Sequence, residues 1–235
     1  MTSLGRLLHV ASEEGPLVAA ELVVRKAGGV IFGADRTYFG IASLTDRLYD
    51  WRTGLDTGGV IQLEEMGINK DAGRYYIGMA PRTWKVIFKH LSIDPSKFTY
   101  IDLGCGKGRT LLFARDFGFR RRIGVDISPR LIETACENCS KKSVAAELVC
   151  ADATQYEFPE EPLVVFMYNP FLEDVMRAVA AKLSESLRRR PRQVYVVYFQ
   201  PGVPKAWADW PVFYLDDAIY PRYTIYGAET AASLQ

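Results

Sequence analysis

The sequence predicts an α/β fold built on a mostly parallel sheet, and three observations support this prediction. From residue 98 onward, apolar strand-like runs alternate with amphipathic helix-like segments, as they do in stacked β-α units. The first strand-like run leads through three closely spaced glycines into an apolar helix-like run, 110–117. Near the C-terminus, the strand-like runs 212–215 and 220–226 are too close together for a helix crossover, so we expect a hairpin.

The segment before residue 98 is longer than a first strand requires. Three stretches have the apolar spacing of helices: 17–26, 38–49 and 81–90. The glycine-rich stretch 54–78 is expected to be loop-like. We therefore expect an N-terminal helical cap or extension, residues 1–80, followed by an α/β domain, residues 81–235. Open α/β sheets bind ligands at the C-terminal ends of their strands, where this cap would close a pocket. The alternative is that the segment has a purely structural role.

The α/β domain is expected to hold seven strands, with helices between most of them. The strands are predicted at residues 98–103, 122–126, 146–150, 163–168, 193–200, 212–215 and 220–226. The clearest helices are predicted at residues 110–117 and 129–141. All strands but the last two are separated by enough residues for crossovers, which predicts a parallel sheet that one hairpin completes.

Composition and charge are those of an ordinary globular protein. The 235 residues are 49% hydrophobic and 24% charged, and the net charge is +1, so no overall field attracts nucleic acid or an anionic membrane. No uninterrupted apolar stretch approaches the roughly 20 residues of a membrane span. The run 17–24 is interrupted by Glu21 and lacks the flanks of a signal peptide, which predicts a cytoplasmic protein.

The four cysteines are Cys105, Cys136, Cys139 and Cys150. Cys136 and Cys139 form a single Cys-x-x-Cys pair inside a helix-like segment, and both histidines are far away in sequence. A structural zinc site needs a second pair of ligands, so we predict no metal site and expect these cysteines to pack a helix against the sheet. The basic clusters 120–122 and 188–192 are interpreted as solvated loop ends.

The glycine-rich loop after the first strand reads Asp-Leu-Gly-Cys-Gly-Lys-Gly-Arg, from Asp102 to Arg109. Gly104, Gly106 and Gly108 let the backbone approach a ligand closely, and the following helix N-terminus offers free N–H groups. A dinucleotide site would need a glycine where Arg109 stands. The pattern instead resembles the first motif of class I S-adenosylmethionine-dependent methyltransferases, which implies that Asp102 meets the amino group of the methionine moiety.

Two further carboxylates follow the next two predicted strands. Asp126 comes twenty residues after Gly106, where a carboxylate can accept hydrogen bonds from both ribose hydroxyls. Asp152 ends the third strand, and the resemblance implies that it receives the adenine amine, with Ile127 and Ala153 beside the cofactor. A turn or N-cap role is the alternative for either carboxylate alone, but acidic residues at three successive strand ends favour the cofactor site.

The fourth predicted strand ends in Tyr168-Asn169-Pro170-Phe171. In the fold that the resemblance implies, this loop lies against the sulfonium and the incoming acceptor. Asn169 and Tyr168 are therefore candidate catalytic residues together with Tyr76, and Asn169 is also a candidate cofactor contact. The loop is similar to the Asn-Pro-Pro-aromatic signature of amine methyltransferases, although the second proline is missing. The alternative is that Asn169 bonds its own loop and Pro170 starts a helix.

A closer resemblance is to small bacterial class I methyltransferases that combine a Gly-x-Gly-Lys-Gly-Arg loop with a Tyr-Asn-Pro-Phe loop. It implies a seven-stranded, mostly parallel Rossmann-like sheet with a C-terminal β-hairpin and an N-terminal helical cap. These proteins commonly carry Tyr-x-Pro-Thr/Ser-Pro before the first helix, where this chain reads Tyr-Ile-Gly-Met-Ala-Pro, residues 76–81. Two prolines and the hydroxyl are absent, which indicates an altered pocket.

The predicted function is S-adenosylmethionine-dependent methyl transfer to an amine or hydroxyl of a small molecule or a protein side chain. No nucleic-acid or membrane partner is predicted, and the oligomeric state is left open. Neither histidine lies in a motif loop, so no Ser-His-Asp or Cys-His arrangement is available. Two alternatives remain: internal displacement, in which the cofactor's own amine forms a cyclic amino acid and releases methylthioadenosine, and a cofactor-binding protein without catalysis.

Overall fold

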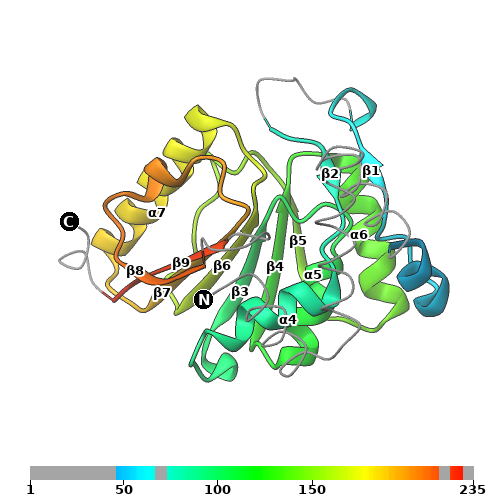
Figure 1. The fold of residues 1–235 in the computed structure, drawn as a ribbon, viewed down its shortest axis with the longest axis horizontal. Helices are drawn as coiled ribbons and strands as arrows, with labels where there is room; N and C mark the ends of the chain where they lie inside the picture. The colour runs from blue at the N-terminus through cyan, green and yellow to red at the C-terminus, as the bar shows by residue number, and fades with distance from the viewer. Residues whose placement is uncertain (1–45, 67–72, 217–222, 230–235) are drawn as a thin grey trace, which may run out of the picture.

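The computed structural model describes residues 46–66, 73–216 and 223–229. Their main feature is a seven-stranded sheet in the order β5-β4-β3-β6-β7-β9-β8 (Figure 1). The strands are β3 (Thr99–Leu103), β4 (Arg121–Asp126), β5 (Glu147–Cys150), β6 (Leu163–Tyr168), β7 (Val194–Phe199), β8 (Val212–Asp216) and β9 (Tyr223–Ala228). Strands β3 to β7 pair in parallel, whereas β9 is antiparallel to both β7 and β8. The predicted sheet and its C-terminal hairpin are confirmed.

Helices cover both faces of this sheet because successive side chains of each strand point to opposite faces. In β3, Ile101 and Leu103 pack into one apolar cluster with α7 (Glu173–Arg189). Tyr100 points the other way, into a cluster formed with α4 (Pro81–Lys89) and α5 (Arg109–Phe117). The central strands are therefore buried on both sides, which explains why they read as continuous apolar runs.

The ends of the helices follow local signals in the sequence. Helix α6 (Pro129–Lys141) begins after Ser128, whose hydroxyl accepts a hydrogen bond from the Leu131 N–H at 3.4 Å. Proline at the first position suits a helix start because its nitrogen has no hydrogen to donate. Helix α5 lies between Gly108 and Gly118, which have φ of 78° and 96°, a conformation that favours glycine.

The N-terminal segment is described from residue 46. Residues 46–53 are helical, and the short strands β1 (Val60–Ile61) and β2 (Tyr76–Ile77) pair antiparallel, with a 3₁₀ turn at Glu64–Met66. The predicted helix 17–26 and most of 38–49 lie outside the described residues. The division at residue 80 stays a prediction, although β2 does lie at the C-terminal end of the sheet (Figure 1).

The two basic clusters lie at the opposite end of the strands, and all their residues except Arg192 are exposed or partly exposed, as the sequence predicted. Arg120 and Arg121 pair with Glu161, and Arg121 also pairs with Glu147. Arg192 is buried and donates to the carbonyl oxygens of three residues. Charged groups at the edge of a fold can serve as internal hydrogen-bond donors, which composition alone does not reveal.

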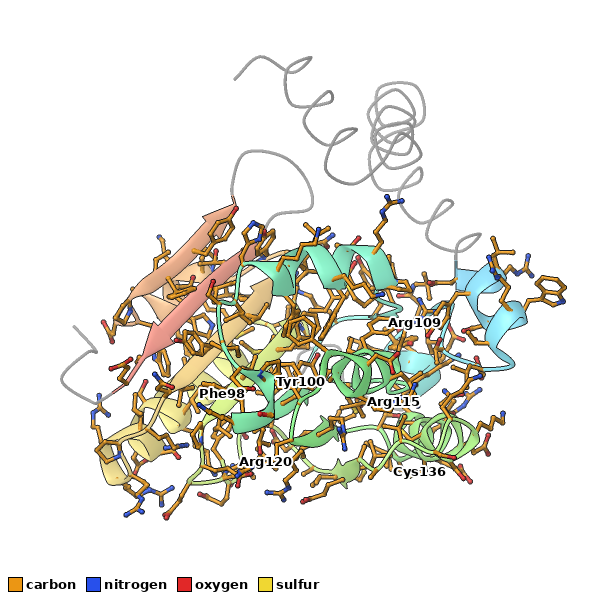
Figure 2. The ribbon with its side chains drawn as sticks, turned by 90° about the horizontal axis from the view of Figure 1, so that it is seen from below. Phe98, Tyr100, Arg109, Arg115, Arg120 and Cys136 are labelled. Atoms are coloured by element: carbon orange, nitrogen blue, oxygen red, sulfur yellow. The ribbon has the colours of Figure 1, made fainter. Side chains whose placement is uncertain are left out.

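The four cysteines differ from one another in their degree of burial. Cys136 is exposed on α6 and Cys139 is buried, and all four cysteines are free thiols (Figure 2). Over residues 46–66, 73–216 and 223–229, no three or more His, Cys, Asp or Glu side chains gather as metal ligands would. No helix within those ranges has the length and apolar character needed to cross a membrane.

Candidate functional site

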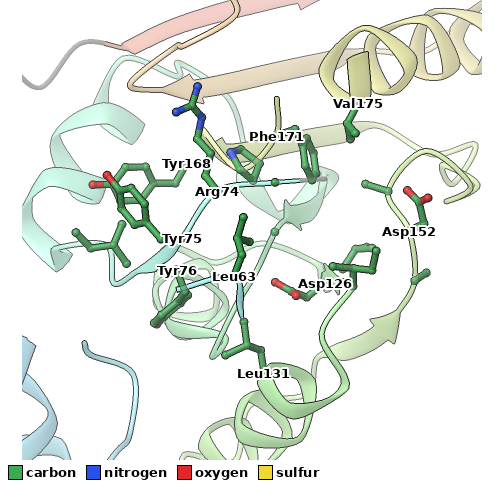
Figure 3. A pocket seen from close by; sticks show the side chains of 18 residues that line it. Leu63, Arg74, Tyr75, Tyr76, Asp126, Leu131, Asp152, Tyr168, Phe171 and Val175 are labelled. Atoms are coloured by element: carbon green, nitrogen blue, oxygen red, sulfur yellow. The ribbon is translucent and has the colours of Figure 1, made fainter. Parts of the chain in front are cut away.

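A pocket opens at the C-terminal ends of β3, β4, β5 and β6, where the sheet meets the N-terminal segment (Figure 3). The empty space between its walls, including the part open to solvent, is about 850 Å³. Asp126 and Asp152 lie on one side, and Tyr75, Tyr76 and Tyr168 lie on the other. The other lining residues labelled in Figure 3 are Leu63, Arg74, Leu131, Phe171 and Val175.

The glycine loop brings its backbone to the pocket at Gly104. The N–H groups of Gly104 and Cys105 donate to the Val125 carbonyl at 2.8 and 3.1 Å, which turns the chain sharply at the end of β3. Gly104 has φ of 80°, and a Cβ there would lie 2.6 Å from Cβ of Pro170. Glycine is therefore required both for the turn and for the close approach of the loop after β6.

Gly106 and Gly108 are not among the residues that line the pocket. A Cβ on Gly106 would overlap the ring of Tyr76, so this glycine makes room for a tyrosine. A Cβ on Gly108 would lie 3.0 Å from Cβ of Ala135, which shows that this glycine lets α5 and α6 approach closely. The sequence predicted ligand contacts for all three glycines, and in this structure only Gly104 reaches the pocket.

Asp126 stands at the end of β4 with 9% of its surface exposed, and it lines the pocket. Its two carboxylate oxygens accept hydrogen bonds from the N–H groups of Gly106 and Ser128, each at 2.9 Å. Burial raises the pKa of Asp126, and the N–H groups of Ser128 and Gly106 act against that rise. Each carboxylate oxygen has a second lone pair, so Asp126 can hold the glycine loop and still accept a hydroxyl of a ligand.

The wall beyond Asp126 is formed by Ile127, Asp152 and Ala153. One oxygen of Asp152 accepts from the N–H and the hydroxyl of Thr154, both at 2.8 Å, so the residue also fills the turn role considered above. Ile127 is an apolar side chain that stays 45% exposed beside two carboxylates. An uncovered apolar surface flanked by acceptors suits a flat base that carries an amino group.

Asp102 lies beneath the loop and does not line the pocket. Only 3% of its surface is exposed, and its carboxylate accepts a hydrogen bond from the Thr110 hydroxyl. Burial raises the pKa of Asp102 to about 7, which the hydrogen bond from Thr110 partly offsets. This placement departs from the expected contact with an amino group, because Asp102 lies on the same face of β3 as Tyr100, which is the face toward α5.

The loop after β6 contributes Tyr168, Pro170 and Phe171 to the pocket, but Asn169 turns away from it. Asn169 has φ of 43°, and its side-chain oxygen accepts from the Tyr198 hydroxyl and the Gly202 N–H, both at 3.2 Å. Asn169 therefore joins this loop to the one after β7. The helix that follows begins at Glu173, so Pro170 does not start it.

Tyr76 forms the wall between the pocket and the N-terminal segment. Its hydroxyl donates to the Thr57 carbonyl at 2.5 Å, and its ring lies against Gly106. Burial raises the pKa of the Tyr76 phenol far above its ordinary range, so the group stays neutral at physiological pH. Tyr76 can present a ring face to a ligand, but it is no proton acceptor at that pH.

Sequence reasoning did not identify Leu63, Arg74, Leu131 and Val175, which also line the pocket. It also missed Lys107 and Arg109, which both turn away from the pocket toward residues 46–58. A signal was present, because two basic residues in a loop that is otherwise buried must find partners. Those partners are about fifty to sixty positions earlier, beyond the reach of a local pattern.

The arrangement has two chemically different sides. Carboxylates beside an exposed isoleucine can bind a group with hydroxyls and a base, whereas Tyr76, Tyr168 and Phe171 offer aromatic surface. Electron-rich ring faces attract cations when water is excluded. The pocket therefore fits an extended ligand that carries a polyol and base at one end and a positive charge at the other.

Comparison with known families agrees with this geometry. Residues 101–190 match the model of a methyltransferase domain. The matched segment begins in β3 and ends just after α7, so it contains the glycine loop, Asp126, Asp152 and the loop after β6.

Similar curated proteins match over short segments. One is an uncharacterised protein of Methanocaldococcus jannaschii, 44% identical over 52 residues, or 22% of this chain and 24% of that protein. Another is the ribosomal protein L11 methyltransferase of Tolumonas auensis, 37% identical over 57 residues, or 24% of this chain and 20% of the relative. The chain thus spans about a quarter or less of the length of the curated relatives it matches.

Solved structures show the same fold over about two thirds of the chain. A ribosomal protein L11 methylase from Lactobacillus delbrueckii subsp. bulgaricus aligns with a TM-score of 0.50 at 14% identity, covering 63% of this chain and 77% of that one. An RNA methyltransferase from Salinibacter ruber, in complex with S-adenosyl-L-homocysteine, aligns with a TM-score of 0.51 at 23% identity, covering 64% and 92%. The seven-stranded sheet therefore has the fold of these methyltransferases.

Proposed function

We propose that this chain is an S-adenosylmethionine-dependent methyltransferase that acts on an amine or hydroxyl of a small molecule or a protein side chain. The observation that carries the proposal is the convergence of Gly104, Asp126 and Asp152, from three successive strand ends, on one pocket. These residues lie within the segment that matches a methyltransferase domain. A fold alone supports no activity, so the proposal depends on the pocket as well.

The residues present fit the cofactor. Asp126 keeps unused lone pairs for the ribose hydroxyls, and Asp152 with the exposed Ile127 suits the amine and the flat face of adenine. Tyr76, Tyr168 and Phe171 line the pocket and would offer aromatic surface to a bound sulfonium. Asp102 does not support the expected contact with the methionine amine, since its carboxylate lies beneath the loop.

S-adenosylmethionine supplies an electrophilic methyl group that passes to the acceptor nitrogen or oxygen as its bond to sulfur breaks. The contribution of the protein is to align the two reactants and to exclude water. Tyr76 and Tyr168 are candidates for that role at the aromatic side of the pocket. Asn169 is a candidate for an indirect role, because its side-chain oxygen accepts hydrogen bonds from Tyr198 and Gly202 and so fixes the loop after β6 to the loop after β7.

Among the described residues, the groups of the pocket wall that could accept a proton are two carboxylates. The carboxylates of the wall lie on the side assigned to adenosine, and the Tyr76 phenol is held neutral. An acceptor amine would therefore have to arrive unprotonated and lose its proton to solvent after transfer. Curated relatives that methylate ribosomal protein L11 make a protein side chain one acceptor to test first.

The cofactor assignment is tested by calorimetry with S-adenosylhomocysteine and with NAD. We expect binding of the first and none of the second, because Arg109 occupies the position of the third dinucleotide glycine. Asp126→Asn should weaken S-adenosylhomocysteine binding by about 1.5–3 kcal/mol, the scale of a charge-assisted hydrogen bond. The exposed Asp209→Asn is the matched control. Tight NAD binding without binding of S-adenosylhomocysteine would overturn the assignment.

The reaction is tested by mass spectrometry of the products. S-adenosylhomocysteine that forms only when an acceptor amine, alcohol or L11-type peptide is added would support methyl transfer. Methylthioadenosine formed from S-adenosylmethionine alone would mean internal displacement instead. A bound cofactor that is recovered intact under every condition would make the protein a binder without catalysis.

A further inference from the structure

Arg109 is the most deeply buried cation of the glycine loop. It is the first residue of α5, only 2% of its surface is exposed, and Figure 2 places it between α5 and the N-terminal segment. Its guanidinium pairs with Asp46 and, at 3.5 Å, with Asp50, and Nε donates to the Thr57 hydroxyl at 2.7 Å. The ring of Tyr49 lies under the guanidinium, 4.8 Å away. One arginine thus holds both the helix 46–53 and the turn after it.

Lys107 holds the same segment from the other side of Gly108. Its ammonium donates to the Asp56 carboxylate at 2.6 Å and to the Gly58 carbonyl at 3.0 Å. Asn138 of α6 completes the attachment, since its amide group donates to the Asp56 carbonyl at 2.6 Å and to the Lys107 carbonyl at 3.0 Å. Both basic residues of the glycine loop therefore bind residues 46–58, and neither lines the pocket.

Tyr76 connects this attachment to the pocket. Its hydroxyl is bonded to the carbonyl of Thr57, the residue whose side chain Arg109 binds. Its ring packs on Gly106 and also lines the pocket. Gly78 lies close to the guanidinium of Arg109: a Cβ added at Gly78 would be 2.7 Å from Nη1 of Arg109. The position of the Tyr76 ring is therefore set from both sides by contacts that lead to Arg109.

We propose that Arg109 is a positioning residue, which docks residues 46–58 on the glycine loop and thereby holds Tyr76 in place as a wall of the cofactor pocket. This inference rests on the proposed function. Because coupling between two sites is reciprocal, a cofactor that binds better to the docked form must also stabilise the docking of residues 46–58. Cofactor binding should then slow the local opening of residues that do not contact the cofactor.

Hydrogen exchange of the full chain tests the coupling directly. The N–H groups of Thr57 and Gly58 donate to the Asp50 carboxylate at 2.9 and 2.6 Å, and neither residue lines the pocket. Saturating S-adenosylhomocysteine should slow exchange at these two amides by about tenfold, within the range of typical coupling. Slower exchange confined to residues that line the pocket would overturn the coupling. A chain that binds no S-adenosylhomocysteine would instead overturn the proposed function.

Kinetics of Arg109→Lys separate positioning from a merely structural role. Lysine keeps the charge but cannot reach Asp46, Thr57 and Met79 at once, as the guanidinium does. We expect KM for S-adenosylmethionine to rise about tenfold with kcat changed less. A loss of kcat at constant KM would indicate fewer folded molecules and would overturn the proposal. Arg115→Lys, on the exposed side of the same helix, is the matched control.

Tyr76→Phe keeps the test valid should the Arg109 variant fail to fold. This change retains the ring on Gly106 and removes only the hydroxyl bonded to Thr57. The proposal predicts that S-adenosylhomocysteine still binds, while the ligand-dependent slowing of exchange at Thr57 and Gly58 falls by at least half. Unchanged slowing in this variant would show that the connection does not run through Tyr76.

Discussion

The Asp102 carboxyl is an acidic group buried beneath the glycine loop, and it accepts a hydrogen bond from the Thr110 hydroxyl. Burial raises its pKa from the ordinary 3.8 to about 7. A folded-state pKa above the unfolded value means that the folded protein prefers the protonated carboxyl. Its contribution to stability is therefore fully present below about pH 4 and is lost as the pH rises through about 7.

Asp102→Asn should remove this dependence on pH. The amide oxygen can still accept the Thr110 hydroxyl, and the amide carries no charge at any pH. We expect the free energy of unfolding of the variant, relative to the parent, to increase by a few kcal/mol between pH 4 and pH 8. Urea denaturation over that interval is the measurement, with Asp209→Asn as the exposed control. A constant difference across the interval would contradict the assignment.

Gly106 and Tyr76 are predicted to be energetically coupled. Gly106 has φ of 53°, and a Cβ there would overlap the Tyr76 ring. Gly106→Ala should therefore cost about 1–2 kcal/mol for the backbone conformation and more for displacing the ring. In a Tyr76→Ala background the second part should vanish, which gives a coupling energy of about 0.5–3 kcal/mol in a double-mutant cycle.

Gly118→Ala is the control for that cycle. Gly118 has φ of 96°, but nothing lies within 4 Å of the position of its Cβ. Gly118→Ala should therefore lower the free energy of unfolding only by the conformational term, with no coupling energy to Tyr76. Equal coupling at both glycines, measured by urea denaturation, would rule out the ring as the cause.

At the scale of elements, the C-terminal end of α7 depends on Arg192. This buried side chain donates to the Ser186 and Arg190 carbonyls at 3.1 and 2.8 Å and to the Glu161 carbonyl at 3.0 Å. The Ser186 carbonyl already accepts from the Arg190 N–H at 3.0 Å, so Arg192 adds a second, charged donor to it and also donates to the Ser186 hydroxyl at 2.9 Å. The same side chain ties the helix to the turn before β6.

Arg192→Met should lower the free energy of unfolding by about 2–4 kcal/mol, because it keeps most of the volume but removes the charged donor of four hydrogen bonds. The exposed Arg188→Met, from the same basic run, should change it by less than about 0.5 kcal/mol. Thermal or urea denaturation of the two variants makes the comparison. Similar effects at both positions would mean that Arg192 acts only as a surface charge.

The sequence predicted most elements of the sheet domain correctly, since their signals are local. The bounds of β6 and α6 agree with the predicted ranges 163–168 and 129–141. Ser128 and Pro129 mark the start of that helix in the sequence itself. The first two strands were misplaced by one residue at one end, which is within the spread of strand boundaries.

At the scale of the molecule, the pocket was predictable because the C-terminal ends of parallel strands lie at the same edge of the sheet. Asp126 and Asp152 follow adjacent strands, so their meeting required only the correct topology. The orientation of Asp102 and Asn169 was not predictable in the same way. Asn169 turns toward Gly202 because of its positive φ and the loop after β7, and no local pattern encodes either. The partners of Arg109 are likewise set by tertiary packing alone.

The strand order of the C-terminal hairpin has a consequence for how the chain is made. β9 lies between β7 and β8, although it is synthesised after both. During vectorial synthesis, β7 therefore keeps unpaired N–H and C=O groups along one side until residue 223 onward is available. Its sequence, Val-Tyr-Val-Val-Tyr-Phe, combines high β-propensity with no charge, the composition that promotes pairing between chains.

A chain that ends after Asp216 should consequently self-associate, whereas one that ends after Glu229 keeps β9 and should not. Light scattering over a range of protein concentrations distinguishes the two, and a monomeric short chain would refute the idea. By this reasoning β9 protects β7 from pairing with other chains, and β7 lacks that protection until β9 has been synthesised.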